Sequence, residues 1–172
     1  MSGPIPAHVE PRKLTDRAVA FNGQLDSRLM PRLSALLHEP AGLAEVQLQF
    51  ERDEQGVRLM RGHYRLDVTL ICQRCLESVT LPLDSRCVVG FVDSDEAARQ
   101  LPRSYEPVIV DDETLDLHAL IEDELLLALP AVPMHPDEHC QHPSGFQPDP
   151  DDSDKAEKPN PFSVLATLKR DI

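Results

Sequence analysis

Tryptophan is absent from this sequence of 172 residues, and aromatic residues make up only 4% of it. Hydrophobic residues still make up 41%, so we expect a core built mainly of leucine, valine and alanine. No apolar run approaches the ~20 residues that span a bilayer. The polar, proline-rich start "MSGPIPAHVEPRK" also lacks the pattern of a signal peptide. These absences predict a soluble cytoplasmic protein with no membrane partner.

Cysteine is scarce too: there are four, too few for a disulfide framework in a chain of this length. In a reducing compartment, a close cysteine pair indicates a thiol site or a metal site. The sequence also lacks a P-loop, a G-x-S-x-G motif and an H-E-x-x-H motif. We therefore expect no small-molecule substrate and no catalytic residues.

Three segments alternate apolar and polar residues with the period of two that is typical of strands: residues 44–50, 60–72 and 79–91. Joined by polar turns, they predict an antiparallel meander with one exposed face. Gly62 interrupts the apolar face of the second strand, which predicts a bulge. We expect further strands before the turn signal Asn22-Gly23 and at residues 108–110.

Two segments have helical spacing. Residues 26–40 place leucines at helical intervals before Pro40, and residues 115–129 do the same before Pro130. Glu122, Asp123 and Glu124 would point about 100° apart on the second helix, so we expect a solvated face rather than paired catalytic carboxylates. The predicted fold class is α+β: an antiparallel sheet of about four or five strands, two packed helices and a mobile acidic C-terminal tail.

Charge divides the chain unevenly. Residues 1–90 carry 11 basic and 11 acidic side chains, whereas residues 91–172 carry 6 and 19. The acidic half favours a basic protein partner or serves solubility. We expect one α+β domain at 1–136, an acidic proline-rich linker at 137–159 and a docking helix at 160–172. That helix would start at the N-cap Asn160 and Pro161, and something must bury its apolar side chains, Phe162 and Leu165.

Cys72 and Cys75 form a C-x-x-C pair at the tip of the hairpin joining the second and third predicted strands. Such a pair on a tight turn supplies two ligands of a tetrahedral zinc site. The other ligands could come from His135, His139 and Cys140. Structural thiols remain an alternative. A redox pair is a further one, although a thioredoxin-like pair opens a helix. The alternation places Cys87 in the core.

Arg61, His63 and Arg65 share the exposed face of the second strand. They could contact RNA phosphates, but the exposed aromatic residues that RNA-binding sheets use for base stacking do not alternate with them. A solvated sheet face is the alternative. These three residues are therefore candidate partner-binding residues of the sheet.

Four stretches in register resemble the bacterial YceD family: "CQRCLESV", "LPRSYEPVIV", "LIEDELLLALPAVPMHPDEHC" and "PNPFSVLATLKR". The resemblance covers roughly residues 8–172. It implies non-enzymatic support of 23S ribosomal RNA accumulation and large-subunit biogenesis. The charge distribution adds a basic ribosomal protein or an assembly factor as the expected partner, and rRNA is a further candidate. The resemblance also implies that some relatives carry a second cysteine pair near the segment "HPDEHC", where this chain has only Cys140. A metal- or thiol-dependent enzyme acting on RNA is the alternative.

Overall fold

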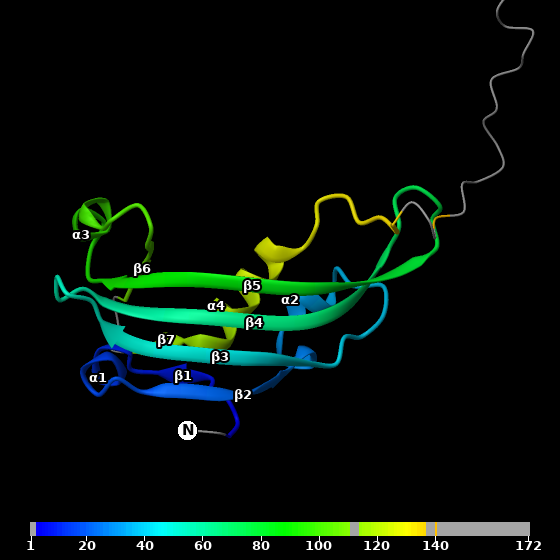
Figure 1. Ribbon diagram of the computed structural model, residues 1–172. Coiled ribbons are helices and arrows are strands. Elements are labelled where there is room, and N and C mark those ends of the chain that lie inside the picture. Colours follow the sequence, from blue (N-terminus) through cyan, green and yellow to red (C-terminus); the bar gives the residue numbers. More distant parts are fainter. Residues whose placement is uncertain (1–2, 111–113, 137–139, 141–172) are drawn as a thin grey trace, which may run out of the picture. The chain divides into compact units, whose positions relative to one another are not determined.

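A computed structural model describes residues 3–110, 114–136 and 140 of the chain. Its main feature is a five-stranded sheet in the order β2-β3-β4-β5-β6 (Figure 1). The strands of this sheet are β2 (Ala20–Asp26), β3 (Leu43–Arg52), β4 (Arg58–Ile71), β5 (Ser78–Val92) and β6 (Glu106–Ile109). These elements belong to one compact unit, Met1–Cys140.

The three alternating segments become β3, β4 and β5, as predicted. β4 and β5 pair antiparallel from Leu59–Gly90 to Ile71–Ser78, and β3 pairs antiparallel with β4. Successive side chains point to opposite faces, so one face of the sheet is buried and the other exposed. The largest fully buried side chains on the buried face are Val46, Phe50, Met60, Tyr64, Val68 and Val89.

The meander is antiparallel only as far as β5. β6, which includes most of the strand expected at residues 108–110, runs parallel to β5 and pairs with its last four residues. The chain reaches it through helix α3 (Asp95–Gln100), whose N-cap Ser94 accepts a hydrogen bond from the Ala97 amide. A separate two-stranded sheet pairs β1 (His8–Val9) with β7 (Leu115–Asp116).

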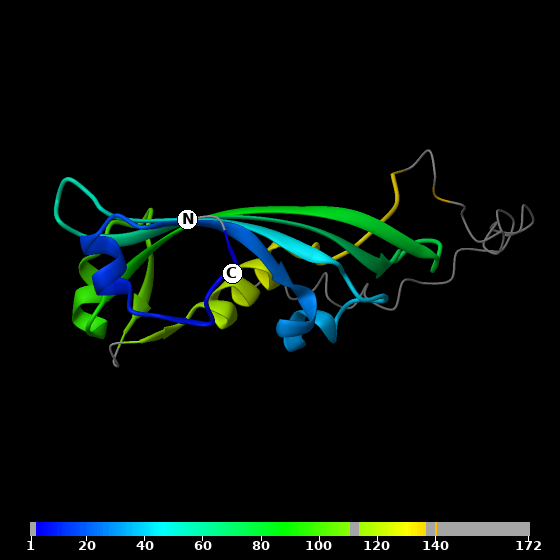
Figure 2. The same cartoon turned by 90° about the horizontal axis from the view of Figure 1, so that it is seen from below.

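Helix α4 (Leu117–Ala128) is the longest described helix and lies on one side of the sheet, leaving the other side open (Figure 2). Asp116 caps it by accepting a hydrogen bond from the Ala119 amide at 3.0 Å. Its fully buried side chains, Leu117, Ile121 and Leu125, join the core under the sheet. In the described part of the chain, no helix is both long enough and apolar enough to cross a membrane.

The first predicted helix is wrong in extent. Residues 26–40 hold only a 3-10 turn, η1 (Ser27–Leu29), and one helical turn, α2 (Pro31–Ser34). Pro31 has no amide hydrogen and fits the first position of a helix, so it starts a new helix rather than continuing η1. A further short helix, α1 (Pro11–Asp16), precedes β2. Asn22 and Gly23 lie inside β2 instead of at a turn.

Gly62 marks no bulge, because the pairing of Gly62 with Leu48 and Cys87 continues the register without interruption. The absence of a side chain makes room for Tyr64 instead. A Cβ at position 62 would collide with the buried Tyr64 hydroxyl and lie 2.8 Å from Cys87 Sγ. The same space allows the Tyr64 hydroxyl and the Cys87 thiol to approach within 3.5 Å.

Two of the three consecutive acidic residues on α4 are buried, which corrects the prediction of a solvated face. Glu122 accepts a hydrogen bond from the Leu33 amide at 3.0 Å and another from Arg32 Nε at 2.8 Å, so it attaches α2 to α4. Only Asp123 is exposed, and it also binds Arg32. A buried carboxylate needs such partners, because burial without them is costly.

Glu124 is the second buried carboxyl group, with 6% of the residue exposed. Burial raises its pKa to about 7, and the adjacent Glu106 carboxyl of β6 adds to the effect through charge repulsion and a hydrogen bond. The Cys87 thiol also contacts it. Near neutral pH, Glu124 therefore exchanges a proton while packed against the sheet.

Replacing Gly62 with alanine is expected to lower the free energy of unfolding by about 1–3 kcal/mol, because the added methyl group overpacks the site of Tyr64 and Cys87. Chemical denaturation measures the loss. Gly42→Ala is the control, since a Cβ at Gly42 meets no atom within 4 Å. Equal stability of the two variants would show that the core yields freely around Tyr64.

Replacing Glu124 with glutamine is expected to change how stability depends on pH. The native protein keeps the Glu124 proton up to about pH 7, whereas the unfolded chain releases it near the ordinary value of 4.5. Stability contributed by this proton is therefore lost as pH rises between these values. Glutamine cannot ionise, so the variant should gain stability relative to the original protein between pH 5 and pH 8. Thermal melts at both pH values test this; an unchanged stability difference would contradict it.

Candidate metal centre

The turn between β4 and β5 carries Cys72 and Cys75. The Cys72 amide donates to the Glu77 carbonyl at 2.8 Å, and the Leu76 amide donates to the Cys72 carbonyl at 2.9 Å. Leu76 has a φ of 64°, in the left-handed region that a residue with a side chain rarely adopts. Such strain persists where the surroundings impose it, and it often lies at functional sites.

A second segment reaches this turn from the end of α4. Pro130 and Pro133 cannot continue the helix, and the chain runs back to the hairpin as an irregular segment, residues 130–136, here called the strap. The Gln73 amide donates to the Pro133 carbonyl at 2.9 Å, which joins the strap to the hairpin. The strap therefore returns to the hairpin tip that carries Cys72 and Cys75.

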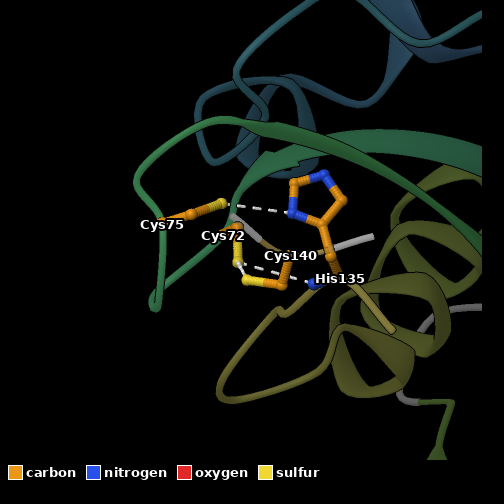
Figure 3. A group of neighbouring side chains, drawn as sticks. All are labelled: Cys72, Cys75, His135 and Cys140. Atoms are coloured by element: carbon orange, nitrogen blue, oxygen red, sulfur yellow. Dashed lines mark hydrogen bonds between the residues drawn. The ribbon is translucent and has the colours of Figure 1, made fainter. Parts of the chain in front are cut away.

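Four side chains converge where the hairpin and the strap meet: Cys72, Cys75, His135 and Cys140 (Figure 3). One ligand atom from each lies within 4.8 Å of all the others. Cys72 Sγ lies 3.9 Å from Cys140 Sγ, and Cys75 Sγ lies 3.3 Å from His135 Nδ1. Tetrahedral bonds of about 2.3 Å to sulfur and 2.0 Å to nitrogen place such atoms ~3.5–3.8 Å apart. The four residues thus lie close enough to bind one metal ion.

His135 is oriented for ligation by its second ring nitrogen. His135 Nε2 lies 3.1 Å from the Ser78 carbonyl oxygen at the start of β5. A proton on Nε2 can be donated to that carbonyl, which leaves the Nδ1 lone pair facing the cysteines. Outer hydrogen bonds of this kind fix the ring of a metal-binding histidine. The sequence cannot indicate this contact, because every residue has a backbone carbonyl group that could accept the hydrogen bond.

The hydrogen bonds around Cys72 favour its thiolate. Burial alone would raise the pKa of Cys72, but hydrogen bonds to its sulfur from the backbone of Cys75, His135 and Arg74 lower it to about 5. The His135 amide lies 3.4 Å from that sulfur. A thiolate is the form in which cysteine binds metals.

Cys140 behaves in the opposite way. Burial raises the pKa of Cys140 to about 11, and the neighbouring Cys75 and Cys72 sulfurs reinforce the rise. Several thiolates in one small space repel each other, so without a cation the group keeps protons. A divalent cation at the centre would reverse this repulsion. The chemistry of the four side chains therefore suits a cation.

The redox alternative has a poorer structural setting. The four described cysteines are free thiols, and the C-x-x-C pair lies on a turn between strands rather than at the start of a helix. Cys87 faces the core beside Tyr64, as the alternation predicted, and is not part of the cluster. His139, the other predicted ligand, lies outside the described residues.

The predicted partner-binding residues of the sheet lie apart from the cluster, on the open face of β4. Arg61 Nε pairs with Glu51 at 2.7 Å, and Asp84 accepts hydrogen bonds from both His63 and Arg65 at 2.9 and 3.0 Å. Neighbouring carboxylates thus offset the positive charges of Arg61 and Arg65, and phosphate binding there remains a prediction. The other candidates, Asn160, Pro161, Phe162 and Leu165, lie outside the described residues.

Comparisons with known proteins find a matching family model and a similar protein. The family model described as "Large ribosomal RNA subunit accumulation protein YceD" matches residues 60–169, which include all four cluster residues. A protein of Haemophilus influenzae with that same description is 36% identical over 172 residues, covering 96% of this chain and 97% of the relative. No solved structure matches the chain.

The fold and the cluster therefore define an α+β protein with a Cys3His group of metal-binding character. With both the family model and a relative of equal extent in agreement, the chain belongs to the YceD family.

Cobalt(II) is expected to bind the metal-free protein at about one equivalent, with the strong visible and near-ultraviolet absorption of a tetrahedral site with several thiolates. Cys72→Ser should remove most of the thiolate-to-cobalt absorption, because it deletes a ligand. Cys87→Ser, outside the cluster, is the control and should leave the spectrum unchanged. Cobalt binding without thiolate absorption would contradict the assignment of these ligands.

Proposed function

We propose that this protein is a non-enzymatic factor that supports accumulation of the 23S ribosomal RNA during formation of the large ribosomal subunit in the cytoplasm. Family membership carries the proposal, because the full-length relative bears the description of a large ribosomal RNA subunit accumulation protein. The match extends along almost the whole of both chains. A shared role thus has support from almost the whole length of the chain and not from one motif.

In this proposal the cluster holds zinc as a structural ion. Three cysteines and one histidine form a closed set of four ligands, which is typical of structural zinc. Catalytic zinc usually has three protein ligands and an open position for water. The ion would fasten the strap to the hairpin, which among the described residues share one backbone-to-backbone hydrogen bond, from the Gln73 amide to the Pro133 carbonyl.

The contacts of the acidic residues on α4 also favour a role without catalysis. Glu122 is fully engaged by Arg32 and by the Leu33 amide. Glu124 packs against Cys87 and Glu106 under the sheet. Neither carboxyl group is free to work on a substrate, so binding is the better-supported activity. The partner would be a basic ribosomal protein, an assembly factor or rRNA.

Deleting the gene in the source organism should lower the ratio of 23S to 16S RNA and the amount of large subunits in gradient profiles. The double variant Cys72→Ser/Cys75→Ser should reproduce much of this loss, because opening the cluster frees the strap. Cys87→Ser is the matched control with the cluster intact. An unchanged RNA ratio after complete deletion, at all growth temperatures tested, would overturn the proposed function.

A further inference from the structure

An apolar groove lies beside the cluster, where the strap crosses from α4 to the hairpin. Two pockets of about 540 and 480 Å³ share Pro130 and Pro133 of the strap as lining residues. We call the larger one the strap groove. Six leucine and isoleucine residues from the loop after α2, from β4 and from the C-terminal end of α4 line it: Leu36, Leu37, Leu70, Ile71, Leu126 and Leu129.

The lining excludes a highly charged ligand. Among the described residues around the strap groove, His38 and Gln73 carry the polar side chains, and none of the lining residues is arginine, lysine, aspartate or glutamate. A phosphate backbone would find no cation pair there, whereas nucleic-acid sites depend on such contacts. The lining instead fits apolar side chains of another polypeptide.

Large apolar side chains around the strap are exposed to an unusual degree. Leu36 is 60% exposed, and on the strap Val132 and Met134 are 57% and 42% exposed. Leu127, in the last turn of α4, is 78% exposed. Single exposed apolar residues are common, but Leu36, Val132 and Met134 line two pockets that share residues of the strap, and such a group marks an interaction site.

The sequence after the cluster indicates the charge of the partner. Cys140 is held in the cluster, and within residues 149–157 one lysine accompanies five acidic residues: Asp149, Asp151, Asp152, Asp154 and Glu157. Asp149 follows Cys140 by nine positions in the sequence, so the chain cannot separate them by more than about 30 Å. These negative charges attract the lysine and arginine side chains of a basic partner.

We propose that the strap groove binds a segment of a basic protein that presents apolar side chains next to lysine or arginine residues. Leucine- and isoleucine-lined walls would bury the apolar side chains, while the acidic stretch after Cys140 would steer the basic ones. This inference rests on the proposed function, and it deepens it by choosing a basic protein over RNA and by naming the contact surface.

Photocrosslinking in cells of the source organism tests the groove with the full-length protein. The crosslinking amino acid p-benzoylphenylalanine replaces Leu36, at the groove. In a control protein it replaces Leu43, which is 53% exposed on β3 and does not line the groove. Both positions are exposed, so neither replacement removes core packing. Mass spectrometry identifies the adducts after irradiation.

Position 36 should yield an adduct with a lysine- and arginine-rich protein that position 43 does not yield. Ala131→Arg places a cation on the exposed strap at the groove and should reduce this adduct about tenfold. Gln47→Arg, on the open face of the sheet, adds the same charge elsewhere and should leave it unchanged. Cobalt binding by the variants confirms that the cluster is intact.

Several results would overturn the inference: an adduct with residues 160–170 of the same chain, with a second copy, with RNA or with a protein that is not basic, or no adduct above the control. The proposed function is judged separately by the 23S RNA ratio. A normal adduct with an unaffected ratio would refute the function alone. A lowered ratio on deletion without the adduct would refute the groove alone.

Discussion

The pairing of β4 with β5 is the constraint on which the other features depend. Their register runs unbroken from Leu59–Gly90 to Ile71–Ser78. A slip of one residue would move every side chain to the opposite face, exposing Tyr64 and Val68 and burying Arg61 and Arg65. The same register brings Cys87 beside Tyr64 over Gly62 and leaves the two cysteines of the turn at its tip. Core, open face and cluster therefore share one origin.

The parts of the fold that could be predicted are those with a strong local pattern. Apolar and polar residues alternate over residues 60–72 and 79–91, and this pattern identifies two long strands. A strand with one buried and one solvent-exposed face produces such an alternation, with a period of two residues. The prediction of one helix over residues 26–40 was wrong because its leucines follow helical spacing, whereas Pro31 divides the segment into two short helical turns. β6 could not be oriented from sequence, because four residues carry no information on direction.

The carboxylates of α4 show why burial is hard to read from residue type. Glu122 and Glu124 lie on a helix whose other buried residues are apolar, and acidic residues are usually exposed. Glu122 is buried because residues about ninety positions earlier, Arg32 and Leu33, supply its hydrogen bonds. Gly62 is a related case, since Tyr64 two residues later occupies its space. Such contacts arise only when the chain is folded.

The cluster was partly predictable, because Cys72 and Cys75 are local while His135 and Cys140 carry suitable donors shortly after two prolines. The orientation of His135 by Ser78 and the hydrogen bonds to Cys72 were not, since backbone groups leave no trace in the sequence.

Cys75 and His135 are separated by 60 positions, and this spacing distinguishes the folded chain from the unfolded one. Bringing two points that far apart together in a disordered chain costs about 4 kcal/mol of loop-closure entropy. In the unfolded chain, Cys72 and Cys75 are close enough to bind an ion together. Binding through all four residues would require the unfolded chain to pay the loop-closure entropy first. An ion held by all four would therefore select molecules in which β5, α3, β6 and α4 are already in place.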